Sequence, residues 1–153
     1  AHWLDSIGKL EAVVHIQTNI GLQMTTDFVR EFCEKQDWKL YVIEPNPKFT
    51  YASFCLEYGF PLPAFHRLIM GKLKYKTMRD FALTIDRKNH CLMSGVRKFE
   101  STRRMGNYPS PIQTDGSMWF ANPIFYKSSE ETYRYVHENN LEICILGTIW
   151  HSM

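Results

Sequence analysis

The sequence predicts an α/β domain in which a mostly parallel β-sheet carries helices on both faces, a Rossmann-like three-layer arrangement. Three observations lead to this class. Short, nearly continuous apolar runs such as AVVHI (12–16) are typical of strands buried on both faces. Amphipathic stretches with apolar residues at i, i+3, i+4 and i+7 lie between these runs. Strands that alternate with helices in this way favour parallel pairing through helical crossovers.

Length and composition indicate one domain over residues 1–153. Hydrophobic residues make up 44% of the chain and charged residues 22%, close to the average for globular domains. The net charge of +2 does not indicate a nucleic-acid or membrane partner, so any electrostatic contact has to be local. No apolar run reaches the ~20 residues of a membrane-spanning helix. The four cysteines lack zinc-site or disulfide spacing, which predicts reduced thiols in a cytoplasmic protein.

The first half of the chain is expected to contain two strands and two helices. The β-branched run AVVHI (12–16) predicts the first strand. Thr25 and Thr26 are expected to cap the helix that continues DFVREFCEKQ, because Thr side chains accept from the free N–H groups of a first turn. KLYVIE (39–44) predicts a second strand, which two following prolines end. FTYASFCLEYG predicts the next helix, with Gly59 as its stop.

The second half is expected to add a helix, two strands and a final helix. KTMRDFALTI (76–85) places Met78, Phe81, Ala82 and Ile85 on one helical face. HCLMSG (90–95) predicts the third strand, and a long Gly-, Pro- and Ser-rich loop is expected to follow as far as Ser117. WFANPI (119–124) predicts the fourth strand. SSEE (128–131) is a capping box that predicts the start of the last helix.

Positive charge gathers on GVRKFESTRR (95–104), called the basic segment below, which directly follows the predicted strand HCLMSG. Ligands of parallel sheets bind outside the carboxyl ends of the strands, so the basic segment should face a ligand. Arg presents a planar fork that matches phosphate or sulfate oxygens, and Gly95 would let the backbone turn tightly. Glu100 could orient an Arg or accept from a ribose hydroxyl, and Ser101 could donate to phosphate. A solvated basic loop and a nucleic-acid contact remain alternatives.

Two further segments are weaker candidates for contacts with an anion. QTNIGLQMTT (17–26) leads from the first strand into a helix whose free N–H groups can receive an anion, although an ordinary βα loop explains it equally well. HRLIMGKLKYKTMRDF (66–81) carries alternating lysines, which mark either a solvated face or another phosphate contact. No histidine has a partner at metal-ligand spacing, and no Walker A, G-x-G-x-x-G, G-x-S-x-G or H-E-x-x-H motif is present.

In this order, the segments resemble the phosphoadenosine phosphosulfate (PAPS) reductase family of the adenine nucleotide α-hydrolase-like, PP-loop ATP pyrophosphatase superfamily. HIQTNIGLQMTTDF is similar to the family's VDTG-x-x-F-P-E-T, with Gln17, Thr18 and Asn19 at the D-T-G positions and Thr25 at the helix entry. MGKLKYKTMRDF corresponds loosely to a Lys-bearing helix. GVRKFESTRR matches the family's G-x-R-x-x-E-S-x-x-R. NPIFYKSSEETYRYVHENNL follows its N-P-L-x-x-W-x-x-x-D-V-W-x-Y-I-x-x-x-x-L at Asn122, Pro123, Tyr135, Val136 and Leu141.

The resemblance implies an adenine-nucleotide-binding domain of an enzyme that either reduces a sulfonucleotide, as an oxidoreductase, or cleaves ATP between its α- and β-phosphates, as a transferase does. The implied ligand is ATP or a PAPS-like nucleotide, with Mg²⁺ as an optional companion. No iron–sulfur cluster is expected, because the position of the Cys pair that holds one in some family members falls near residues 69–71, where this chain has no Cys. It assigns no catalytic residue and no metal ligand. The nucleotide- and phosphate-binding residues that it implies are Gln17, Thr18, Asn19, Thr25, Lys74, Gly95, Arg97, Glu100, Ser101 and Arg104.

The chain also departs from the family pattern. Gln17 replaces the Asp of the VDTG motif, and no S-G-G-x-D-S phosphate loop precedes AVVHI. The family's C-terminal Cys segment would lie beyond Met153, so we expect a chain that is incomplete at both ends. The alternative function is a non-catalytic interaction or nucleic-acid-binding module that keeps the scaffold. The loss of an N-terminal strand would expose an edge or the centre of the sheet, which makes a homo-oligomer a further hypothesis.

Overall fold

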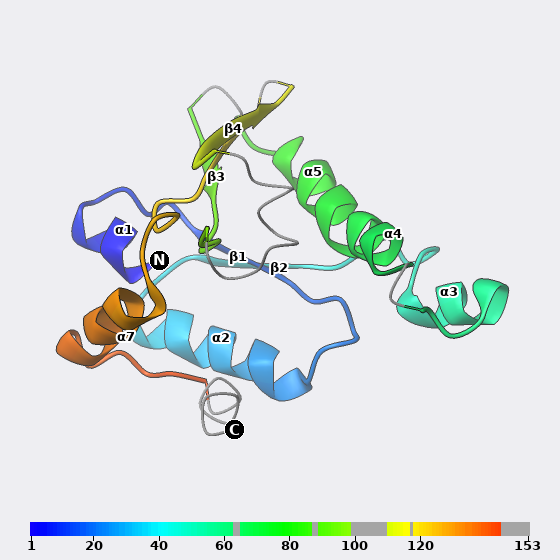
Figure 1. The fold of residues 1–153 in the computed structure, drawn as a ribbon, viewed down its shortest axis with the longest axis horizontal. Coiled ribbons are helices and arrows are strands. Elements are labelled where there is room, and N and C mark those ends of the chain that lie inside the picture. The colour runs from blue at the N-terminus through cyan, green and yellow to red at the C-terminus, as the bar shows by residue number, and fades with distance from the viewer. Residues whose placement is uncertain (63–64, 87–88, 99–109, 117, 145–153) are drawn as a thin grey trace. The chain divides into compact units, whose positions relative to one another are not determined.

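In the computed structural model, the chain divides into two compact units. Figure 1 shows the helices and strands of both as a ribbon. Unit 1 comprises Ala1–Phe81 together with the residues from Ile143 onward, and unit 2 comprises Ala82–Glu142. The residues that the structure describes are 1–62, 65–86, 89–98, 110–116 and 118–144.

Unit 1 is built on two parallel strands joined by a helical crossover. β1 pairs with β2 from Val13↔Leu40 to Ile16↔Ile43, and α2 connects them and contacts β1. Both predicted strands, the helix between them and their parallel pairing are therefore confirmed. The residues of β1 are half-buried. The elements of unit 1 are α1 (His2–Ser6), β1 (Val13–Ile16), α2 (Gln23–Lys35), β2 (Leu40–Ile43), α3 (Tyr51–Tyr58), α4 (His66–Met70), the π-helix η2 (Gly71–Tyr75) and α5 (Lys76–Ala82), whose last residue belongs to unit 2.

The predicted start of α2 is wrong. The helix begins at Gln23 after Leu22, which offers no side-chain cap, so Thr25 and Thr26 lie inside the first turns rather than at the cap. Thr26 is buried, and its hydroxyl lies at hydrogen-bond distance from the imidazole of His15 on β1. This contact between a strand and a helix uses the hydroxyl that local capping would have needed, and it cannot be predicted from local sequence alone.

A hydrophobic core cluster of unit 1 joins α3 to α4 and η2. Phe54 and Leu73 are fully buried there together with Ile69. α3 begins at a capping box formed by Thr50 and Ser53, and it ends at Gly59 with φ 79°, as predicted. The positive φ explains the glycine, since side chains with a Cβ rarely adopt it. The helix predicted over 76–85 ends at Ala82, so Ile85 lies outside it; the rest of the predicted face is the less exposed one, with Ala82 buried.

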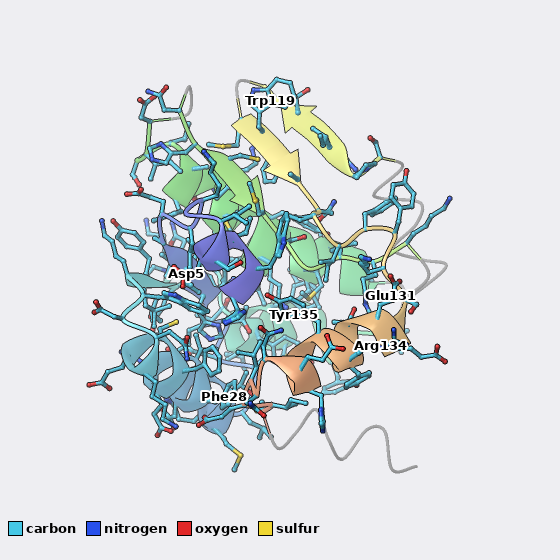
Figure 2. All side chains as sticks on the ribbon, turned by 90° about the vertical axis from the view of Figure 1, so that its left-hand side faces the viewer. Asp5, Phe28, Trp119, Glu131, Arg134 and Tyr135 are labelled. Carbon is cyan, nitrogen blue, oxygen red and sulfur yellow. The ribbon has the colours of Figure 1, made fainter. Side chains whose placement is uncertain are left out.

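Unit 2 contains a three-stranded sheet in the order β3–β5–β4. β3 (Cys91–Met93) and β5 (Met118–Ala121) are parallel, whereas β4 (Ile112–Asp115) and β5 are antiparallel. Residues 112–115 were predicted as loop, and this prediction is wrong. The backbone turns between β4 and β5 at Gly116, whose φ is 62°. Trp119 on β5 (Figure 2) is 51% exposed.

The last helix, α7 (Ser129–Glu138), confirms the capping box predicted from sequence. The hydroxyl of Ser128 accepts from the backbone N–H of Glu131 at 3.1 Å, and the carboxylate of Glu131 accepts from the N–H of Ser128 at 2.8 Å. β5 ends at Ala121 rather than at residue 124, because Pro123 has no N–H to continue a ladder and the chain turns there. Within the described ranges, no helix is both long enough and apolar enough to cross a membrane.

Candidate functional site

The basic segment begins at the carboxyl end of β3, where the sequence placed it, and its described part is held against the turn that precedes α7. The backbone N–H of Ser94 donates to the carbonyl of Ala121 at 3.0 Å, and the Ser94 hydroxyl donates to Oδ1 of Asn122 at 2.5 Å. The backbone N–H of Lys98 donates to the carbonyl of Phe125 at 2.7 Å. The segment from Ser94 to Lys98 is therefore fastened at both ends to the turn formed by residues 122–125.

Arg97 lies between these two fixed points. Its Nη1 donates to the hydroxyl of Ser129, the first residue of α7, at 2.9 Å. Within the described part of the chain this is the one side-chain hydrogen bond of Arg97, which is partly exposed. A guanidinium carries five N–H donors, and their planar geometry suits phosphate or sulfate.

Glu131 on α7 is paired with groups other than this guanidinium. Glu131, shown with Arg134 on α7 in Figure 2, accepts from Nζ of Lys127 at 2.7 Å and from the backbone N–H of Ser128. These hydrogen bonds lower the pKa of the Glu131 carboxyl, first through Lys127 and then through the backbone of Ser128. Glu131 is thus already paired, and Arg97 meets a neutral hydroxyl at the start of α7.

The tight turn expected at Gly95 is not present. Gly95 is absent from the glycines with positive φ, and a Cβ added to it would meet Cδ1 of Ile124 at 3.7 Å, an ordinary contact. Neither backbone conformation nor packing within unit 2 therefore requires a glycine here. Gly95 is exposed and has no side chain, so the backbone next to Arg97 is open to solvent.

Three of the predicted site residues, Glu100, Ser101 and Arg104, lie outside the described residues. The others fall into two groups. Gly95 and Arg97 lie in unit 2, and Gln17, Thr18, Asn19, Thr25 and Lys74 lie in unit 1.

In unit 1, the residues at the D-T-G positions form the turn that leaves β1. The N–H of Gln17 donates to the carbonyl of Ile43 at 2.9 Å, which extends the ladder with β2 by one residue. The Gln17 side-chain amide donates to Oδ1 of Asn19 at 3.2 Å, and Asn19 adopts the left-handed φ of 58° that Asn tolerates well. Thr25 follows in the first turn of α2, and Lys74 is exposed on η2. The structure thus brings Gln17 and Asn19 together at the carboxyl end of β1.

His15 is a candidate functional residue that the sequence did not single out. Its Nε2 lies 3.1 Å from Oγ1 of Thr26 on α2. Burial lowers the pKa of the His15 imidazole, and the charges of Arg30 and Lys74 lower it further. In the described ranges, neither Arg30 nor Lys74 has an ion-pair partner. The sequence signal that could have identified His15 is a histidine within an otherwise apolar strand. The D-T-G positions begin two residues later, at Gln17.

The lowered pKa of His15 predicts that acid weakens the fold more in the wild type than in a His15→Gln variant. Because the folded-state pKa lies below that of the unfolded chain, about 6.5, the unfolded chain binds more protons between the two values. Stability should therefore fall as the pH drops below about 6.5. Urea unfolding at a series of pH values measures this, with His137→Gln on α7 as the matched control. An unchanged pH dependence in His15→Gln would contradict the prediction.

Within the described residues, no group of three or more His, Cys, Asp or Glu side chains is placed to hold a metal ion.

The parallel strand pairs and the crossover helix define an α/β protein, and a cationic segment begins at the carboxyl end of β3. The chain belongs to the PAPS reductase family: residues 4–148 match the family described as phosphoadenosine phosphosulfate reductase domain. Its fold is similar to a crystal structure of phosphoadenylyl-sulfate (PAPS) reductase from Candida auris, a phosphate complex, with a TM-score of 0.63 and 18% sequence identity. That match covers 95% of this chain and 70% of the other. No curated protein matches the sequence.

Proposed function

We propose that the chain is the nucleotide-binding domain of a PAPS reductase-like enzyme, and that the basic segment binds the phosphate or sulfate end of a sulfonucleotide. The observation that carries this proposal is the fixed position of Arg97. Its guanidinium is partly exposed at the carboxyl end of a parallel strand, and its one described hydrogen bond is to a neutral hydroxyl. Ligands of α/β sheets bind at this edge, and a planar cation there suits an oxyanion.

The remaining site residues complete the proposed contacts. Gln17, Thr18, Asn19 and Thr25 would lie by the adenosine. Lys74, Gly95, Glu100, Ser101 and Arg104 would add to the phosphate contacts.

We further propose that units 1 and 2 form a single domain with one mostly parallel sheet covered by helices on both faces. The family match spans both units, and each unit contains a parallel strand pair, which supports this.

Sulfonucleotide reduction is favoured over ATP α–β cleavage because of the family to which the chain belongs. ATP, accompanied by Mg²⁺, is the second candidate ligand. The reaction is proposed to take place in the cytoplasm. Gln17 offers an amide where the family motif has a carboxylate, so nucleotide binding without catalysis is the alternative function.

Isothermal titration calorimetry tests this function. Adenosine 3′,5′-bisphosphate, which carries the phosphates of a sulfonucleotide without the reactive sulfate, is the main probe. Adenosine, ATP with and without Mg²⁺, and a short RNA are the comparisons. We expect the bisphosphate to bind about tenfold or more tightly than adenosine, the scale of one charge-assisted hydrogen bond. Binding of the RNA alone, or of no adenine nucleotide, would contradict the proposal.

A further inference from the structure

We propose that Asn122 is a positioning residue that fixes the path of the segment from Ser94 to Lys98 and thereby places Arg97 for an anionic ligand. The ligand in this inference rests on the proposed function. The positioning itself is a property of the protein without ligand and can be measured separately.

Asn122 joins three segments of unit 2 that are distant in sequence. Its Oδ1 accepts from the hydroxyl of Ser94, directly after β3, at 2.5 Å. Its backbone N–H donates to the carbonyl of Pro111, directly before β4, at 2.7 Å. Its carbonyl accepts from the N–H of Phe125, in the turn before α7, at 3.0 Å. The end of β3, the start of the hairpin and the approach to α7 therefore meet at this one residue.

Because Asn122 is buried, its polar atoms need hydrogen-bond partners within the protein. The residue is only 4% exposed, and a buried amide costs free energy unless its polar atoms are hydrogen-bonded. Its hydrogen bond with Ser94 therefore has to form in the folded state, and it requires the Ser94 hydroxyl in one position. An apolar side chain at position 122 would fill the space without constraining Ser94. The amide therefore orients Ser94 in addition to filling the space.

The backbone is anchored a second time at Lys98, four residues after Ser94. The N–H of Lys98 donates to the carbonyl of Phe125, and Phe125 is itself buried. Only Gly95, Val96 and Arg97 lie between the two anchored residues, so the backbone there has little conformational freedom left to lose when a ligand binds. The guanidinium of Arg97 is then held over the first residue of α7.

The alternative is that Asn122 only stabilises unit 2. A purely stabilising contact would change the free energy of unfolding, but it would not separate phosphate-dependent affinity from adenosine affinity. Its loss would lower the protection of the unit 2 amides in general, rather than that of the Lys98 amide in particular.

The test uses Ser94, because it is exposed and its replacement removes the hydrogen bond without placing a cavity in the core. Ser94→Ala removes the hydroxyl, and Ser94→Thr keeps one. Thr132→Ala is the matched control, since it removes a hydroxyl that donates to the carbonyl of Ser128 at 2.9 Å elsewhere in unit 2. Adenosine 3′,5′-bisphosphate and adenosine are titrated calorimetrically, and amide exchange of Lys98 and of the other unit 2 residues is followed by NMR without ligand.

We expect Ser94→Ala to bind the bisphosphate about tenfold more weakly, to bind adenosine as the wild type does, and to exchange its Lys98 amide faster. Ser94→Thr should restore both properties, and Thr132→Ala should change neither. Unchanged exchange together with unchanged bisphosphate affinity in Ser94→Ala would overturn the inference. If the wild type binds no adenine nucleotide, the proposed function fails, and amide exchange decides the inference. Exchange that becomes faster at Lys98 than at the other unit 2 amides, and that Ser94→Thr reverses, supports positioning. An equal change at all of these amides, or no change, overturns it.

Discussion

Replacement of Phe54 by Ala is expected to lower the free energy of unfolding by about 3–5 kcal/mol, the cost of removing a fully buried aromatic side chain. Phe54 is 1% exposed and lies in the core cluster with Ile69 and Leu73. Its ring centroid is 5.0 Å from that of Tyr58 and 6.2 Å from that of Phe65. The loss would leave a cavity lined by these side chains, and a natural domain has only about 5–15 kcal/mol of stability in total.

Urea unfolding of the wild type and of Phe54→Ala measures this effect. Leu56→Ala is the matched control, because Leu56 lies two residues further along the same helix and is 90% exposed. Its replacement should change the free energy of unfolding by no more than about 0.5 kcal/mol, as is usual for surface positions. Similar losses in the two variants would show that α3 is not packed as the structure describes.

The parts of the fold that sequence predicted correctly are those set by local patterns. The capping box at Ser128 needs only residues three apart, and the stop at Gly59 needs only one residue that tolerates a positive φ. The strands over 13–16 and 40–43 are short β-branched or apolar runs bounded by breaks. In each case the physical cause lies within a few residues, so the sequence alone contains it.

The parts that sequence missed depend on partners far along the chain. Residues 112–115 form a strand because β5 pairs with them, although the Gly-, Pro- and Ser-rich surroundings are typical of a loop. Thr26 does not cap α2 because His15 lies within hydrogen-bond distance of its hydroxyl. The rule for strand ends located Arg97 correctly at the carboxyl end of β3. Its contact with Ser129, 32 residues away, has no signature in the sequence.

Arg97→Ala is expected to weaken the binding of adenosine 3′,5′-bisphosphate by about 1–3 kcal/mol, the range for a charge-assisted hydrogen bond. The free energy of unfolding should change little, because Arg97 is partly exposed and its one described hydrogen bond is to Ser129. Arg97→Lys should recover only part of the affinity, since an ammonium keeps the charge but loses the planar fork.

Two further variants separate this specific contact from general charge. Arg134→Ala removes the same charge from an exposed position on α7 and should weaken binding far less than Arg97→Ala at moderate salt, where distant surface charges are screened. Ser129→Ala removes the hydroxyl that Arg97 contacts but leaves the guanidinium in place, so its effect on affinity should be smaller than that of Arg97→Ala. Calorimetry at one fixed ionic strength measures all of them. Equal losses in Arg97→Ala and Arg134→Ala would mean that the ligand senses only the net charge of unit 2, and the basic segment would then not be an oxyanion site.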